Sequence, residues 1–111
     1  MTKSLLLSLA VAAFAVVAGA QEFPSEPHEF IIAKMAAAEG RYDDALSRLD
    51  RIIEKTPNDS VLRFERAMIL IDAGRLERAE SEMRTVVTAS PDFFDAQRVL
   101  GRLLLDRAGT D

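Results

Sequence analysis

Few side chains in this chain have the chemistry for catalysis or metal binding, and their spacing does not bring them together. Cysteine is absent and His28 is the only histidine, so the usual sulfur and nitrogen ligands of a metal site are missing. Asp43 and Asp44 are adjacent, and adjacent helical residues point about 100 degrees apart, which suits stabilisation of a helix start better than paired acid and base catalysis. Ser81 and Ser90 have no neighbouring base. We therefore expect no catalytic site, no bound metal and no cofactor.

Charges of both signs are mixed along the chain. It carries 14 lysines and arginines and 18 aspartates and glutamates, a formal net charge of −4. A nucleic-acid partner requires a concentrated basic surface, and no such run occurs, so we expect no nucleic-acid partner. The composition, 49% apolar and 29% charged, is that of one small globular domain.

The first twenty residues resemble a secretory signal peptide. Lys3 precedes an almost unbroken apolar stretch from Leu5 to Ala18, and Ala18-Gly19-Ala20 offers small residues for cleavage. A retained membrane anchor is the alternative, but the stretch is shorter than the roughly 20 apolar residues that cross a bilayer. We expect a signal peptide at 1–20, cleavage after Ala20, a short linker at 21–25, a periplasmic or secreted protein, and no stable membrane insertion after cleavage.

The rest of the chain repeats at an interval of 34 residues. Pairs of glycines, alanines and prolines recur at this interval: Gly40 and Gly74, Ala45 and Ala79, Pro57 and Pro91. A single offset explains all three pairs. We predict one repeat domain at 26–111, with repeats at 26–59 and 60–93 and a partial repeat at 94–111.

Within each repeat, apolar residues recur every three or four positions, the spacing of an amphipathic helix. Gly40 and Gly74 are placed to end the first helix of each pair, because glycine readily adopts the left-handed conformation. The two prolines end the second helix, and Asp59 or Ser60 is available to cap the helix that follows. We predict helices at 27–39, 43–55, 60–73, 77–89 and 93–107.

Small residues recur where these helices should cross. We expect Ala33, Ala67 and Gly101 to allow close approach of a neighbouring helix, and Ala45 and Ala79 to do the same across each hairpin. A bulky side chain at any of these positions should overpack the contact.

The runs Gly40-Arg41-Tyr42-Asp43-Asp44-Ala45 and Gly74-Arg75-Leu76-Glu77-Arg78-Ala79 resemble the tetratricopeptide repeat family, whose unit is a 34-residue helix-turn-helix. The resemblance covers the chain after about residue 26. It implies an all-α fold in which antiparallel helix-turn-helix repeats stack as a short right-handed α-solenoid, with two full units and a terminal helix.

Four positions depart from the pattern of that family. Glu29, Arg63 and Gln97 stand where an aromatic residue is usual, and Arg66 replaces a leucine. We expect these departures to weaken individual repeats without changing the fold.

The resemblance also implies that the first helices of successive repeats line a concave groove that binds other proteins. The side chains projected onto that face are Phe30, Lys34, Phe64, Met68, Ile71, Asp72, Arg98, Arg102 and Leu105. Such a groove is apolar in the middle and basic at one end, which suits an amphipathic helix or an extended segment with an acidic group. Two simpler interpretations stay open: the aromatic and methionine side chains belong to the core, and the two arginines lie on a solvated helix face.

The last predicted helix is strongly apolar, because Leu100, Leu103, Leu104 and Leu105 cluster within it. We expect this end to pack against a second copy, a partner or further repeats. The function that we predict is a protein-interaction scaffold outside the cytoplasm, and not an enzyme. The alternatives are a periplasmic chaperone-like holder of secreted clients and the N-terminal arm of a larger envelope protein.

Overall fold

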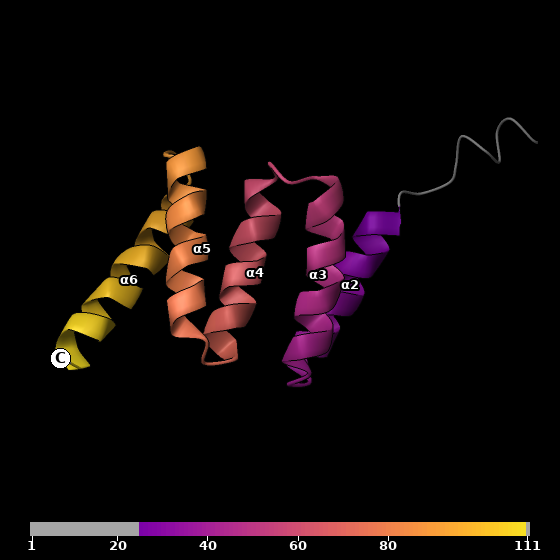
Figure 1. Ribbon diagram of the computed structural model, residues 1–111, viewed down its shortest axis with the longest axis horizontal. Helices are drawn as coiled ribbons and strands as arrows, with labels where there is room; N and C mark the ends of the chain where they lie inside the picture. The colour runs from indigo at the N-terminus through magenta and orange to yellow at the C-terminus, as the bar shows by residue number, and fades with distance from the viewer. Residues whose placement is uncertain (1–24, 111) are drawn as a thin grey trace, which may run out of the picture.

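The computed structural model describes residues 25–110, and within them the chain forms five helices and no strand. Figure 1 shows the helices standing side by side, from α2 and α3 at one end to α6 at the other. Their bounds are Ser25–Ala38 for α2, Tyr42–Lys55 for α3, Ser60–Asp72 for α4, Leu76–Ala89 for α5 and Phe94–Thr110 for α6. The predicted signal peptide, and the linker up to residue 24, lie outside the described residues.

All five predicted helices are present, and the largest differences lie at the two ends of the row. Helix α2 begins at Ser25, two residues before the predicted start at residue 27, because a proline such as Pro27 is tolerated in the first helical turn. Helix α6 continues to Thr110, three residues past the predicted end at residue 107. None of the helices in residues 25–110 is long and apolar enough to cross a membrane.

The helices pack as hairpins that stack on one another. Helix α2 packs on α3 and α4 packs on α5, and the hairpins are joined through α3 against α4 and α5 against α6. These four main contacts are between helices that are neighbours along the chain, which is the arrangement of a short α-solenoid. The all-α repeat fold predicted from the sequence is therefore confirmed.

Glycines end the first helix of each hairpin, as predicted. Gly40 has a φ angle of 78° and Gly74 a φ angle of 75°. The backbone N–H of Arg41 donates to the carbonyl of Ala36 at 2.8 Å, and the N–H of Arg75 donates to the carbonyl of Leu70 at 2.8 Å. These bonds satisfy carbonyls that the helix end leaves without a partner, so each glycine closes its helix and turns the chain back.

Asp59 is the residue that caps α4. Its carboxylate Oδ1 accepts from the backbone N–H of Val61 at 3.0 Å and from that of Leu62 at 3.1 Å. The hydroxyl of Ser60, the other predicted candidate, instead lies 2.6 Å from the hydroxyl of Ser90. A cap at Asp59 fixes where the second repeat begins.

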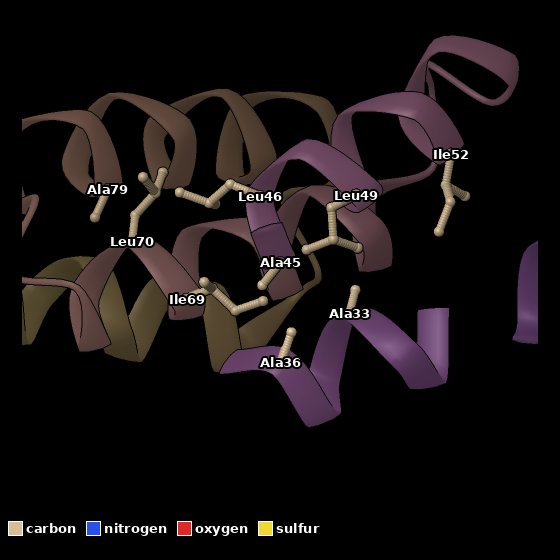
Figure 2. Packing of buried hydrophobic residues seen from close by; sticks show 9 residues of the cluster. All are labelled: Ala33, Ala36, Ala45, Leu46, Leu49, Ile52, Ile69, Leu70 and Ala79. Carbon is tan, nitrogen blue, oxygen red and sulfur yellow. The ribbon is translucent and has the colours of Figure 1, made fainter. Parts of the chain in front are cut away.

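The predicted small residues lie at the helix crossings in both full repeats. Ala33, Ala45, Ala67 and Ala79 are completely buried. Figure 2 shows Ala33 and Ala36 of α2 directed toward α3. The prediction for Gly101 was wrong: a side chain added there would meet nothing within 4 Å. No helix of the described residues covers that side of α6.

Two clusters of buried side chains hold the row together. The first joins α2, α3, α4 and α5 and includes Leu46, Leu49, Ile69 and Leu70. The second joins α4, α5 and α6. The buried members of the second cluster are Ala67, Met83, Val86 and Ala96. Because both clusters include α4 and α5, the second hairpin connects the whole fold.

Two alanine substitutions at glycine should have opposite effects on stability. Gly74→Ala should lower the free energy of unfolding by about 1–2 kcal/mol, because a side chain strains the left-handed conformation. Gly101→Ala should raise it by about 0.5–1 kcal/mol, because Gly101 lies within a helix and the added methyl group meets no neighbour. Urea unfolding followed by circular dichroism measures both. A loss of stability in Gly101→Ala would contradict the open side of α6.

Candidate interaction surface

The predicted groove residues occupy equivalent positions on the first helices α2, α4 and α6. Phe30, Phe64 and Arg98 are separated by the 34-residue interval. The Lys34 ammonium lies 2.6 Å from the Glu65 carboxylate, which joins α2 to α4. The first helices of the two full repeats therefore form one surface.

The apolar part of this surface also belongs to the core. Phe64 is half-buried, and its ring centroid lies 4.9 Å from that of Phe93. Met68 and Ile71 pack against the second cluster, and Phe30 packs against the first. These four side chains stabilise the fold and leave part of their surface accessible, so the structure is compatible with both interpretations offered for them. Their role in binding stays a prediction.

The charged part of the surface lies mostly on α6. Arg98 and Arg102 have side chains 79% and 80% exposed, so they lie on a solvated face. Arg98 pairs with Asp95 at 2.9 Å, and Arg102 lies 3.7 Å from Asp106. The predicted basic end therefore carries its own acidic partners. Leu105 is 72% exposed on the same helix, and Lys34 and Asp72 are exposed at the ends of α2 and α4.

The leucines of α6 do not form one exposed patch. Leu100 and Leu103 pack toward the cores, Leu104 is half-buried and Leu105 is exposed. Their directions follow from the helical period, because consecutive leucines at 103, 104 and 105 point to different sides.

Sequence reasoning missed a cleft of about 290 Å³ between the second hairpin and α6. Its apolar walls are Ile71, Leu76 and Leu103, from α4, α5 and α6. Its charged lining consists of Glu77, Glu80, Asp106 and Arg107. The signal for it was present in the repeat interval, since the position of the buried Leu46 in the first repeat is occupied by Glu80 in the second.

Glu80 is held by two arginines beside this cleft. Arg84 lies 3.0 Å from its Oε1 and Arg107 lies 2.8 Å from its Oε2. The Glu80 side chain is 12% exposed. Hydrogen bonds from Arg84 and then from Arg107 lower the pKa of the Glu80 carboxyl below its ordinary value. The pair with Arg107 attaches α6 to α5, whereas the pair with Arg84 lies within α5. The first junction of the fold, between α3 and α4, has the buried Leu46 at the position of Glu80.

The attachment of α6 should weaken in acid. Because the folded pKa of Glu80 is lowered, its contribution is present above the unfolded pKa of about 4.3 and is lost as the pH falls through the folded value. Wild type should therefore be more stable than Glu80→Gln at pH 7, and the difference should shrink as the pH falls below about 4. Thermal unfolding across this range, with the exposed Glu54→Gln as control, measures it. An unchanged difference at pH 3 would contradict the assignment.

Two of the four departures from the family pattern, Glu29 and Arg63, form ion pairs between the helices of their hairpins. Arg48 lies 3.1 Å from Glu29 in the first hairpin, and Arg63 lies 3.5 Å from Glu82 in the second. The two pairs occupy equivalent positions with the signs reversed. The departures are thus compensated across each hairpin.

Arg66 extends this arrangement in the second repeat. Its guanidinium lies 2.7 Å from Glu82 and 2.9 Å from Asp50 of α3, and the Arg66 side chain is 15% exposed. Burial opposes the charge, but the hydrogen bonds to Glu82 and Asp50 outweigh it and raise the pKa of Arg66. Arg66 therefore joins the first and second repeats through charge, at a position where the family usually has leucine.

Within residues 25–110, no group of three or more histidine, aspartate or glutamate side chains is placed to hold a metal ion. What the structure presents is a row of helical hairpins with small side chains at the crossings, a face made by the first helices, and a cleft beside the last helix. These features define an α-helical repeat protein.

Comparison with known proteins gives the family. Residues 36–103, more than half of the chain, match the model of the tetratricopeptide repeat. The chain is 32% identical over 71 residues to tetratricopeptide repeat protein 33 of Xenopus laevis, covering 64% of this chain and 28% of that protein. It is 36% identical over 66 residues to the TPR repeat-containing thioredoxin TTL4 of Arabidopsis thaliana, covering 60% of this chain and 10% of that protein. The chain belongs to the tetratricopeptide repeat family, whose repeats are typically non-catalytic and bind other proteins.

Proposed function

We propose that this protein is a non-catalytic scaffold that binds a helix or an extended segment of another protein along α2, α4 and α6. The observation that carries the proposal is the continuous surface of the first helices, joined by Lys34 and Glu65 at 2.6 Å. That surface combines partly accessible apolar side chains with exposed charges, a combination that suits an amphipathic segment.

The partner that this surface suits has apolar side chains followed by an acidic group. Phe64 and Met68 offer the apolar contact in the middle, while Lys34, Arg98 and Arg102 offer positive charge. The existing pairs of the two arginines are largely solvated, and such surface ion pairs contribute only about 0–1 kcal/mol. A carboxylate of the partner therefore replaces them at little cost.

Charge reversal on an exposed cation of α6 tests this proposal without disturbing the core or the contact between α2 and α4. Arg98→Glu should weaken partner binding about fivefold to tenfold, because the new carboxylate repels the acidic group. A photo-reactive amino acid at position 102 should crosslink the partner in the cells of origin, and the crosslinked protein supplies the ligand for affinity measurement.

Arg51→Glu on α3 is the matched control, because Arg51 is an exposed arginine on a second helix. Binding should be unchanged in this variant, and a photo-reactive group at position 51 should not crosslink the partner. Equal crosslinking from positions 51 and 102 would reject the first-helix surface.

A chaperone-like holder of secreted clients is the alternative activity of the same surface. The recovered proteins distinguish the two, since a scaffold yields one stoichiometric partner and a holder yields many clients. The chain spans less than a third of either relative's length, 28% and 10%. A second alternative is that it forms the N-terminal arm of a larger envelope protein. The mass of the protein recovered with an antibody against the repeats tests that role.

We further propose that the chain is exported and works in the periplasm or outside the cell. Lys3 and the apolar stretch ending in Ala18-Gly19-Ala20 support this. Mass spectrometry of the protein recovered from its compartment should find Gln21 as the first residue. Recovery of uncleaved protein from the cytosol would reject export.

Self-association through α6 is a further element of the proposal. Phe94 and Leu105 are 73% and 72% exposed on that helix, and exposed apolar side chains favour association. Size-exclusion chromatography with light scattering tests it, and a monomer at high protein concentration would count against it.

A further inference from the structure

The cleft between α5 and α6 has apolar walls, and no side chain of the described residues fills the space between them. Leu76 is 47% exposed, and Leu103 and Ile71 are half-buried. Figure 1 shows α6 leaning away from α5 toward its C-terminal end, where these residues lie. The cleft measures about 290 Å³, at the small end of ligand-binding cavities and suited to a side chain.

The first junction of the fold shows what this space accepts. There Leu46 of α3 is 5% exposed and packs in one cluster with Ile69 of α4, which is 2% exposed. At the second junction, between α5 and α6, the equivalent residues are Glu80 and Leu103. The second junction therefore has a glutamate where the first has Leu46, and this glutamate pairs with Arg84 and Arg107. A leucine-sized group from outside would make the contact that the first junction makes internally.

The charged residues of the cleft indicate which side chains flank the leucine-sized group. Among its lining residues are three carboxylates, Glu77, Glu80 and Asp106, and one cation, Arg107. Glu77 on α5 and Asp106 on α6 are both exposed, and Arg102 lies 3.7 Å from Asp106. Glu80 is neutralised by Arg84 and Arg107, whereas Glu77 forms no ion pair among the described residues and Asp106 has only a solvated pair with Arg102. These two exposed carboxylates favour a cationic neighbour beside the apolar group.

We propose that this cleft is a second binding site, in which a partner protein inserts a leucine-like side chain flanked by lysine or arginine. The apolar group lies against Leu76 and Leu103, in the role that Leu46 has at the first junction. The flanking cations lie beside Glu77 and Asp106. This site adjoins the first-helix surface proposed above and shares Ile71 with it, but it also includes α5 and takes a segment of opposite charge.

Short synthetic peptides are the probes. A labelled peptide of sequence Gly-Lys-Leu-Lys-Gly should bind the full chain, and its Kd should be about tenfold lower than those of Gly-Glu-Leu-Glu-Gly and Gly-Lys-Ser-Lys-Gly. Fluorescence anisotropy gives the affinities. Nuclear magnetic resonance of the labelled chain should place the largest shifts at Leu76, Glu77 and Leu103.

Three variants test the cleft. Glu77→Lys should raise the Kd of the lysine peptide about fivefold to tenfold, and Glu54→Lys, a matched exposed glutamate on α3, should leave it unchanged. Leu76→Ser should raise it about tenfold by removing one apolar wall. Glu80→Leu should block binding, because the new leucine occupies the cleft as Leu46 occupies the equivalent space at the first junction. Circular dichroism verifies that each variant is folded.

Two results would overturn the proposal: equal binding of the lysine and glutamate peptides, or shifts centred on Phe64 and Met68 in place of the cleft. Binding that survives Glu80→Leu in a folded chain would also overturn it. Because Arg98→Glu tests the first-helix surface and changes no residue of the cleft, failure of one site is distinguished from failure of the other.

Discussion

Leu70→Ala is expected to lower the free energy of unfolding by about 2–5 kcal/mol. Leu70 is 1% exposed and lies in the cluster that joins α2, α3, α4 and α5, where Figure 2 shows it near Leu46 and Ala79. Removing its side chain leaves a cavity between the two hairpins, so the loss combines the transfer of buried carbon with the cost of that cavity. Denaturant unfolding followed by circular dichroism measures it.

Leu76→Ala is the control for Leu70→Ala. It removes the same atoms from a helix of the same hairpin, but Leu76 is 47% exposed. Its cost should be well below that of Leu70→Ala, because fewer contacts are lost. Equal costs would show that the hairpins do not pack through Leu70.

Glu82→Gln should lower the free energy of unfolding by about 1.5–3 kcal/mol, the range for hydrogen bonds to charged groups. Glu82 is 15% exposed and lies 2.7 Å from Arg66 and 3.5 Å from Arg63. The neutral amide therefore removes the carboxylate that the two arginines share, and Arg66 keeps only Asp50. The same unfolding experiment measures this change. Glu54→Gln, on an exposed glutamate, should alter stability by less than about 0.5 kcal/mol.

Replacing Arg66 and Glu82 together by apolar residues separates the contribution of their charges to stability from that of their packing. Arg66→Leu combined with Glu82→Leu should be more stable than Glu82→Gln alone, because a poorly solvated ion pair is often replaced by apolar residues without loss. If the double variant is the less stable of the two, the ion pairs contribute more than a leucine contact in this position.

The helices and turns were predictable because their signals are local. Gly40, Gly74 and Asp59 each act within one turn of a helix, and their neighbours in sequence are also their neighbours in space. The repeat interval then placed the buried alanines of both full repeats. The same interval failed at Gly101, because it treats the three first helices alike although only two of them are covered by a second helix among the described residues.

The surface was less predictable because its side chains act between elements. The sequence placed Phe64 and Arg98 on the face of the first helices, but not the Phe93 ring against Phe64 or the carboxylates that pair with the arginines. The cleft beside α6 needs residues from three helices, and its decisive feature is the replacement of a buried leucine by Glu80. Recognising it requires knowing which side chains meet across a junction.

The reversed ion pairs of the two hairpins have a consequence for assembly of the chain. If α2 folded against α5, Glu29 would face Glu82, and if α4 folded against α3, Arg63 would face Arg48, so repulsion between like charges disfavours both exchanges. The same repulsion disfavours α2 of one molecule against α5 of another, whereas an exchange of equivalent helices keeps the attractive pairs. The two repeats thus remain distinguishable during folding, although each forms the same kind of helical hairpin.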